Sequence, residues 1–347
     1  MKNRILFYCP DQHVLYDGET PYSRGVGGGI TARVRMAKAL AKLDCQVTSV
    51  ANCSEKRTID GVDYRPLSSP LRWEGEVVIL STSGGKMDLQ PYLDTDVNAR
   101  LCIVWVHGVT KPGSLDQIDF DYIYSVSDFI SNVICEQWGL SAERVITTRN
   151  SFEEELFSRA ENTKLKRDPY KLIYFSHPSK GLALAKSILE RLREIDPRYH
   201  LDVLGGAELW GETRLEVAPE SGVYYAGLLG QEAVVQRLLQ STFSLQLQTR
   251  EEPGPLAAVE AMRAGCVVMA SDVGAYREYV EDGSSGFIFE GDPRNPNTQD
   301  EVVGKILELA SKPDELRTIQ LEARRSPQSN QEQASAWLQH WDSSFSC

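Results

Sequence analysis

The chain has 347 residues, enough for two domains that each bury a core of their own. Lys and Arg total 37 and Asp and Glu total 49, so the formal net charge is −12. This balance excludes a protein that coats nucleic acid, because phosphate neutralisation needs a clustered cationic surface. The apolar fraction of 41% excludes a disordered chain. We expect a folded protein.

The seven cysteines include no C-x-x-C pair and mostly lie in apolar runs such as 101–104. They indicate core residues in a reducing compartment rather than a disulfide framework or a zinc site. The apolar stretch within residues 1–10 is too short for a signal peptide, and no run approaches the roughly 20 apolar residues of a membrane span. The sequence therefore predicts a cytoplasmic location.

Short β-rich runs alternate with helical patterns, which is typical of parallel sheets with crossover helices. In the first half, helices are expected at Thr31–Leu43 and Phe129–Trp138, the second capped by Ser127 and Asp128. Strands are expected at Arg4–Cys9, Gln46–Ala51, Val77–Ser81, Ala99–His107 and Tyr122–Ser125.

Four basic residues of the first helix lie outside its apolar face: Arg33, Arg35, Lys38 and Lys42. Such a row is typical of a solvated helix face. It could alternatively touch an anionic membrane at the inner face of the cell envelope. We expect the solvated face and keep peripheral membrane contact as the alternative.

A polar segment without apolar periodicity, Ala160–Asp168, indicates a domain boundary, and a second strand–helix series follows it. We expect domains at 1–165 and 166–328 and a terminal helix within 329–347 that packs back toward the first domain. Strands are expected at Lys171–Phe175, His200–Leu204, Val223–Ala226, Phe243–Gln246, Val267–Ala270 and Gly286–Glu290, and helices at Leu182–Ile195, Glu232–Gln240, Pro255–Ala264 and Gln331–Trp341.

The fold class is therefore α/β, with two Rossmann-like, doubly wound domains that face each other across a cleft. Ligands of such sheets bind outside the carboxyl ends of the strands. One such loop carries Gly27, Gly28 and Gly29 ahead of the first helix. Because about fifteen residues separate the first strand from these glycines, they do not form a dinucleotide fingerprint. Bare amides at a helix N-terminus still suit a phosphate, and the alternative is a flexible loop.

A second informative segment carries the pair Glu252 and Glu260 in the spacing Glu-x7-Glu. Pro255 suits the first turn of a helix, so Glu252 is expected in the loop before the helix and Glu260 within it. The amides of Gly254, Leu256 and Ala257 then form an anion site at the helix N-terminus. The alternative is an acidic first turn that offsets the helix dipole, with a solvated helix glutamate.

Lys180 follows the first strand of the second domain at the entrance of a helix, and Gly181 allows a sharp turn there. This position predicts contact with phosphate, although a lone lysine is more often a surface residue.

Several segments occur in an order that is typical of one protein family. They are the triple glycine, Val106 and His107, residues 150–157, residues 204–206, residues 226–228, and the Glu-x7-Glu helix with residues 264–280. In these segments the chain resembles the large retaining glycosyltransferase family 4, which has the two-domain GT-B fold. The departures are a shorter loop at 176–180, where His177 stands near the family's phosphate-binding arginine, an altered loop at 252–256, and Ser151 in place of a glycine.

The resemblance implies a retaining transfer of a hexose, glucose first, from a UDP-sugar to a carbohydrate or lipid-linked acceptor in surface polysaccharide or glycoconjugate synthesis. It implies no metal and no cofactor. Glu260 would accept the ribose hydroxyls, Glu252 the sugar hydroxyls, and Lys180 would stabilise the departing diphosphate. His107 would contact the hexose. The remaining substrate-binding residues would be Gly27, Gly28, Gly29, Ser176, His177, Gly254, Leu256, Ala257, Asn150, Gly205 and Leu228.

Two other functions stay open, since a fold does not fix its chemistry. One is a nucleotide-sugar epimerase or a phosphorylase on the same scaffold. The other is a regulator that binds a nucleotide sugar without turnover.

Overall fold

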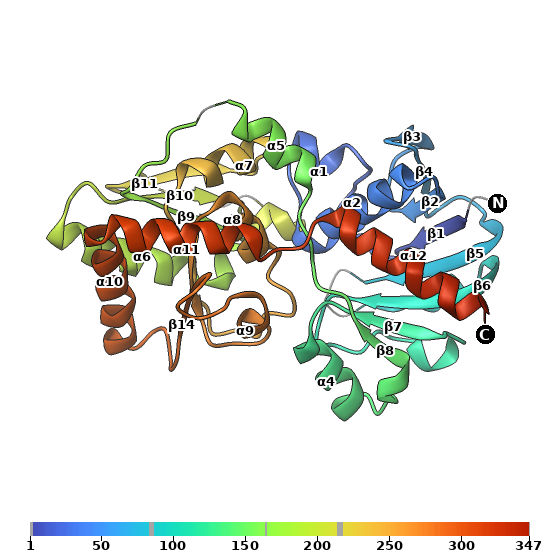
Figure 1. Cartoon of the computed structure of the whole chain (residues 1–347). Helices are drawn as coiled ribbons and strands as arrows, with labels where there is room; N and C mark the ends of the chain where they lie inside the picture. Colours follow the sequence, from blue (N-terminus) through green and yellow to red (C-terminus); the bar gives the residue numbers. More distant parts are fainter. Residues whose placement is uncertain (1–2, 83–86, 164, 214–217, 347) are drawn as a thin grey trace. The chain divides into compact units, whose positions relative to one another are not determined.

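The computed structural model describes residues 3–82, 87–163, 165–213 and 218–346. The chain divides into two compact units. The amino-terminal unit comprises residues 1–21, 28–151 and 328–347, and the carboxyl-terminal unit comprises residues 22–27 and 152–327. Each unit is built around its own β-sheet (Figure 1).

The sheet of the amino-terminal unit has the strand order β3-β4-β2-β1-β5-β6-β7-β8. Its strands run parallel, except that β3 pairs antiparallel with β4 at the edge. The central strands are apolar along their length because helices and loops cover both faces. The strands are β1 (Arg4–Tyr8), β2 (Gln46–Ala51), β3 (Arg57–Ile59), β4 (Val62–Pro66), β5 (Arg72–Ser81), β6 (Asp96–Val106), β7 (Tyr122–Ser125) and β8 (Val145–Thr147).

One helix of this unit begins at a side-chain cap that the sequence predicts. In α4 the Ser127 hydroxyl accepts a hydrogen bond from the Ile130 amide at 3.1 Å, as the sequence predicts. The helices here are α2 (Gly28–Lys42), α3 (Gln90–Leu93), α4 (Asp128–Gln137) and α12 (Asn330–Ser346), and the short α1 (Thr20–Ser23) lies where the chain first passes to the other unit.

The basic side chains of α2 do not form the solvated row expected from the sequence. Arg33 and Arg35 are only 4% and 1% exposed. Arg33 donates hydrogen bonds to the Cys9 sulfur at 2.8 Å, just after β1, and to the Ser81 hydroxyl at 3.3 Å, at the end of β5. Helix α12 also packs against α2 within this unit (Figure 1). The Lys38 ammonium lies 3.1 Å from the Asp60 carboxylate, with which it forms an ion pair. Arg33 and Arg35 therefore contribute neither to a solvated face nor to a membrane-binding one. No helix in the described part of the chain is long and apolar enough to cross a membrane.

The sheet of the carboxyl-terminal unit has six parallel strands in the order β11-β10-β9-β12-β13-β14. From β9 the chain winds to one side through β10 and β11, and from β12 it winds to the other side. The order reverses between β9 and β12, which is the switch point at which such sheets bind ligands. The strands are β9 (Lys171–Phe175), β10 (His200–Leu204), β11 (Val223–Gly227), β12 (Phe243–Gln246), β13 (Val267–Ser271) and β14 (Gly286–Phe289).

Helices cover both faces of this sheet. One apolar cluster joins the sheet to α5, α7 and α8, and a second joins it to α6 and α10. Both clusters receive a side chain from α11. The helices are α5 (Glu154–Glu161), α6 (Leu182–Ile195), α7 (Gln231–Gln240), α8 (Leu256–Ala264), α9 (Tyr276–Tyr279), α10 (Pro296–Ser311) and α11 (Pro313–Arg325).

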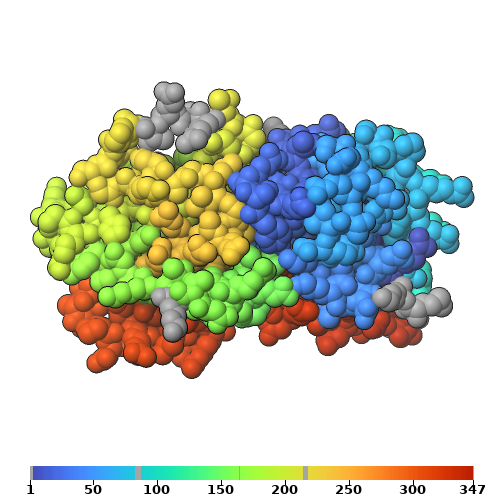
Figure 2. Space-filling model, turned by 90° about the horizontal axis from the view of Figure 1, so that it is seen from above, coloured from blue at the N-terminus to red at the C-terminus, as the bar shows by residue number. Residues whose placement is uncertain are grey.

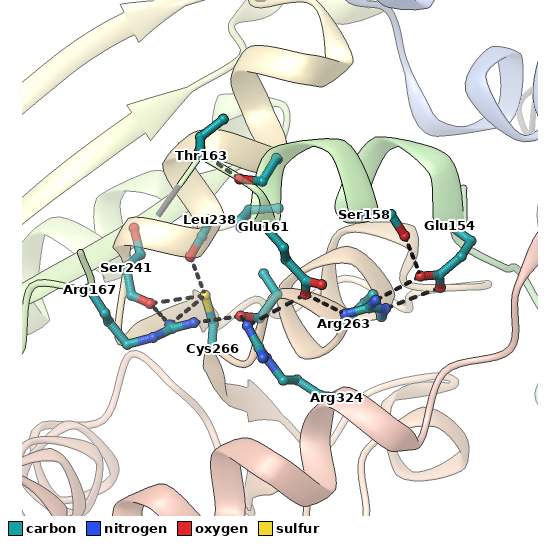
Figure 3. A network of polar contacts seen from close by, with 12 residues as sticks. Glu154, Ser158, Glu161, Thr163, Arg167, Leu238, Ser241, Arg263, Cys266 and Arg324 are labelled. Carbon is teal, nitrogen blue, oxygen red and sulfur yellow. Dashed lines mark hydrogen bonds and ion pairs between the residues drawn. The ribbon is translucent and has the colours of Figure 1, made fainter. Parts of the chain in front are cut away.

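Helix α5 belongs to the carboxyl-terminal unit, so the chain returns to that unit at Phe152, ahead of the boundary expected after residue 165. Its Leu156 and Phe157 are buried in the core of that unit. Arg263 of α8 bridges to Glu154 and Glu161, each at 2.9 Å (Figure 3). On the surface, α5 (green) lies beside α7 (yellow-orange), as Figure 2 shows. The polar segment on which the expected boundary rested follows this helix.

The terminal helix α12 closes the core of the amino-terminal unit. Trp337 and Trp341 are buried in that core, and the Trp341 indole donates a hydrogen bond to the Tyr124 hydroxyl at 3.1 Å. Chain beyond residue 327 therefore completes a core that the first 151 residues begin.

We expect Trp341→Ala to destabilise the amino-terminal unit by about 3–5 kcal/mol, because it removes a fully buried aromatic side chain. Gln339→Ala is the matched control on the exposed side of the same helix. Urea unfolding curves of the two variants measure the difference. Equal stabilities would show that the helix does not complete the core.

Candidate nucleotide-sugar site

Two loops meet at the switch point of the carboxyl-terminal sheet. Lys180 ends a short 3-10 turn (Pro178–Lys180) after β9, and Glu252 lies in the loop after β12. The Lys180 ammonium lies 2.8 Å from the Glu252 carboxylate. The same carboxylate also accepts a hydrogen bond from the Gln248 side chain at 3.2 Å. The two residues that the sequence singled out are thus brought together, with Glu252 only 7% exposed.

A glycine makes this approach of the two loops possible. Gly181 has φ +112°, and a Cβ there would lie 1.8 Å from the Leu247 carbonyl oxygen. Any side chain would therefore force the loop after β9 away from the loop after β12. Lys180 directly precedes Gly181, and Glu252 follows Leu247 in the same loop. The ion pair between Lys180 and Glu252 therefore depends on this close approach.

A second glycine fixes the backbone of Glu252 from the other side. Gly274 follows β13 with φ +58°, and a Cβ there would lie 2.5 Å from the Glu252 backbone. The neighbouring Ala275 amide donates to the Glu252 carbonyl at 2.9 Å. The sequence analysis did not single out Gly274, because a lone glycine after a strand carries no signal of what it contacts.

Helix α8 places Glu260 in its middle, where the side chain is 4% exposed. The helix begins at Leu256 and ends at Gly265 in the left-handed region, with φ +80°. Its N-terminus differs from the expected free anion site in one respect. The Gly254 amide donates to the Glu252 carboxylate at 3.4 Å, so this amide is directed at a side chain of the protein itself. Ala257 occupies the first turn.

His177 is the residue that the sequence analysis expected near the position of a phosphate-binding arginine. Its ring stacks on the Trp210 indole with 3.7 Å between centroids and 5° between planes. Its Nδ1 accepts a hydrogen bond from the Ser179 amide at 3.2 Å. Burial lowers the pKa of His177 below its ordinary value, although the Glu212 carboxylate opposes this shift. The imidazole is therefore neutral near pH 7 and does not replace a permanent cation.

Three further predicted residues lie where the loops after β9, β10 and β11 meet. A Cβ on Gly205 would lie 2.9 Å from the Ser176 carbonyl oxygen, and the Gly205 amide donates to the Gly227 carbonyl at 2.8 Å. Leu228 follows directly after β11. The structure thus brings Ser176, Gly205 and Leu228 to the same end of the sheet as Lys180.

The triple glycine is divided between the units. Gly27 belongs to the carboxyl-terminal unit, where a Cβ on it would lie 3.0 Å from the Leu209 carbonyl oxygen after β10. Gly28 and Gly29 begin α2 in the amino-terminal unit. Only Gly27 is therefore brought beside the loops that carry Ser176 and Gly205, and the expected role of the other two in binding diphosphate stays a prediction.

His107 and Asn150 lie in the amino-terminal unit, both buried. His107 follows β6, and its Nε2 has no hydrogen-bond partner among the described residues. Burial and the Arg33 guanidinium lower the pKa of His107 to about 3. A neutral imidazole with an unused ring nitrogen can exchange a hydrogen bond with a sugar hydroxyl. The expected contacts of His107 and Asn150 with substrate stay predictions.

The sequence analysis missed two side chains that surround His177, namely Trp210 and Arg250. The Arg250 guanidinium lies 5.5 Å from the centre of the Trp210 ring and 3.4 Å from the Ser179 hydroxyl. Trp210 lies four residues after the 204–206 motif but belongs to no motif itself, whereas Arg250 lies two residues before Glu252. Proximity to Glu252 was the one signal that could have identified Arg250.

Residues 158–325, just under half of the chain, match the model of the family described as glycosyl transferases group 1. No curated protein matches the sequence. The segment that matches the family model contains the whole sheet of the carboxyl-terminal unit together with Lys180, Glu252 and Glu260.

Solved structures resemble the whole chain at low sequence identity. A sucrose-phosphate synthase from Thermosynechococcus elongatus has a TM-score of 0.71 at 14% identity, and covers 99% of this chain and 100% of its own. A glycosyltransferase from Rickettsia africae has a TM-score of 0.68 at 13% identity, with 99% and 98% covered. HepE from Anabaena, solved in complex with UDP-glucose, has a TM-score of 0.66 at 15% identity, with 99% of each chain covered. The chain has the GT-B fold.

The lowered pKa of His107 makes a testable contribution to stability. The unfolded chain binds a proton at this residue below about pH 6.5, whereas the folded chain does so only near pH 3. The contribution of the neutral His107 to the free energy of unfolding is therefore complete above pH 6.5 and is lost as the pH falls. Between pH 7 and pH 5 the loss is about 2 kcal/mol.

We expect the wild-type protein to lose about 2 kcal/mol more than His107→Gln between these two pH values, as measured by urea unfolding. The other titrating groups are common to both proteins and cancel in the comparison. An equal loss in the two proteins would show that His107 is not held neutral by burial.

Proposed function

We propose that the protein is a glycosyltransferase that moves a hexose from a UDP-sugar, with UDP-glucose as the first candidate donor. The observation that carries this proposal is the meeting of Lys180 and Glu252, 2.8 Å apart, at the switch point of the carboxyl-terminal sheet. A cation and a carboxylate acceptor at one position suit a ligand that has phosphate on one side and hydroxyl groups on the other. The family match of residues 158–325 supports the same function.

In the proposed reaction the bond between the anomeric carbon and the diphosphate oxygen breaks, and a bond from an acceptor hydroxyl oxygen forms on the same face. The acceptor proton passes to the departing phosphate oxygen. Lys180 stabilises the charge that develops on the diphosphate, which is where a preorganised cation lowers the barrier. No metal or cofactor has a role in this proposal.

The two carboxylates position the donor by accepting hydrogen bonds from its hydroxyl groups. Glu252 accepts hydrogen bonds from sugar hydroxyls, and Glu260 accepts them from the ribose. When phosphate engages Lys180, the Glu252 carboxylate is released from its ion pair and becomes free to accept these bonds. His107 contacts the hexose, and the acceptor is a carbohydrate or a lipid-linked glycan in the synthesis of a surface polysaccharide or glycoconjugate.

The two carboxylates do not act as the catalytic pair of a retaining glycosidase, whose carboxyl groups are about 5 Å apart on either side of the scissile bond. Glu260 lies in the second turn of α8, whereas Glu252 lies in the loop that precedes this helix. In the proposal they bind different parts of one nucleotide sugar.

Incubation with radiolabelled UDP-hexoses tests the proposal. We expect hydrolysis, or transfer when an acceptor is added. Isomerised nucleotide sugar would instead indicate an epimerase, and tight binding without turnover would indicate a regulator. A thermal-shift panel of UDP, GDP and ADP sugars identifies the base, with the largest stabilisation expected from the UDP sugars.

We expect Glu252→Gln to lower turnover by about 100-fold or more while UDP affinity stays the same or rises modestly, because the substitution frees Lys180 from its ion pair. Glu251→Gln removes the neighbouring exposed carboxylate and is the matched control. Steady-state kinetics and UDP binding measure the two effects. Unchanged turnover in Glu252→Gln would remove this residue from the mechanism.

A further inference from the structure

The proposed donor site has too little positive charge in its first loop for a diphosphate. A departing nucleoside diphosphate carries negative charge on both of its phosphates. His177 lies on the loop after β9, and its side chain is neutral near pH 7 because burial lowers its pKa. Lys180 is the permanent cation there, and the Glu252 carboxylate at 2.8 Å offsets its charge. A further cation from outside this loop would complete the site.

Arg250 has the position that such a cation needs. It reaches from the loop after β12 to the Ser179 hydroxyl at 3.4 Å, on the residue next to Lys180. Both Arg250 and Lys180 contribute to lowering the pKa of His177, which places the two cations around one imidazole. All of these residues belong to the carboxyl-terminal unit and lie on the two loops that flank its switch point.

The contacts of Arg250 leave its charge available to a ligand. Its guanidinium lies 5.5 Å from the centre of the Trp210 ring, and neither Trp210 nor Ser179 carries a negative charge. The side chain is exposed to solvent. An aromatic ring orients a guanidinium without neutralising it, so the planar donor group is held in place for an oxygen pair.

The Trp210 ring is positioned by its contact with His177. The ring stacks on His177 at 3.7 Å between centroids, and the His177 Nδ1 accepts from the Ser179 amide. One connected group of contacts therefore links Ser179, His177, Trp210 and Arg250. The neutral imidazole of His177 stacks on the Trp210 indole, and the indole in turn contacts the Arg250 guanidinium.

We propose that Arg250 is the second cation for the diphosphate of the donor, reaching the phosphates from the loop after β12 while Lys180 reaches them from the loop after β9. This inference rests on the proposed function. It assigns Arg250 a direct role in binding the leaving group and assigns His177 and Trp210 a positioning role.

Calorimetric titration of the full chain with UDP tests this assignment. We expect Arg250→Gln to weaken UDP binding by about 10- to 100-fold, because it removes charge-assisted hydrogen bonds to phosphate. Uridine, followed by saturation-transfer NMR, should bind wild type and variant alike, since it has no phosphate. Arg250→Lys should recover part of the lost affinity because it restores the charge.

Arg294→Gln is the matched control, because Arg294 is an exposed arginine of the same unit that is paired with Asp292. We expect it to leave UDP binding unchanged. Unchanged UDP affinity in Arg250→Gln, equal losses of UDP and uridine binding, or no recovery in Arg250→Lys would overturn the role of Arg250. A wild-type protein that binds neither UDP nor any other nucleotide would instead overturn the proposed function itself.

Discussion

The close approach of two loops at the switch point of the carboxyl-terminal sheet is the constraint on which the site depends. Gly181 permits it, since any side chain there would meet the Leu247 carbonyl at 1.8 Å. The result is that Lys180 and Glu252 form an ion pair at the position where an α/β sheet binds its ligand. The Lys180 side chain is 25% exposed and the Glu252 side chain 9%, so an incoming anion can reach the pair from the lysine side. In the proposed function a phosphate takes the place of the carboxylate, and this exchange would link donor binding to the release of Glu252.

Much of the carboxyl-terminal unit could be predicted from its sequence, because parallel strands buried on both faces are continuous apolar runs bounded by turns. The strand Phe243–Gln246 and the helix Leu182–Ile195 have the predicted bounds. The short strands at 57–59, 62–66 and 145–147 were missed. The strands at 57–59 and 145–147 lie at the two edges of the first sheet and are only partly buried, so they lack a continuous apolar run. The strand at 62–66 lies next to the edge and buries only alternate residues, Val62 and Tyr64, so it too lacks such a run.

The errors have a common cause, which is tertiary contact between segments far apart in the chain. Arg33 and Arg35 were expected at the surface, but both are buried, and Arg33 donates a hydrogen bond to Ser81, which lies 48 residues further along the chain. The contact between His177 and Trp210 could not be predicted from the sequence either, because Trp210 lies on the loop after a different strand. Motif spacing singled out Lys180, Glu252 and Glu260, whereas Trp210 and Arg250 emerged as neighbours of His177 and Ser179 only from the folded structure.

The most direct test of the account is a crystal structure of the protein with UDP. We predict phosphate oxygens within hydrogen-bonding distance of the Lys180 ammonium, with the Glu252 carboxylate moved out of its 2.8 Å ion pair. UDP bound away from the switch point, or an intact pair between Lys180 and Glu252 beside a bound diphosphate, would contradict the account.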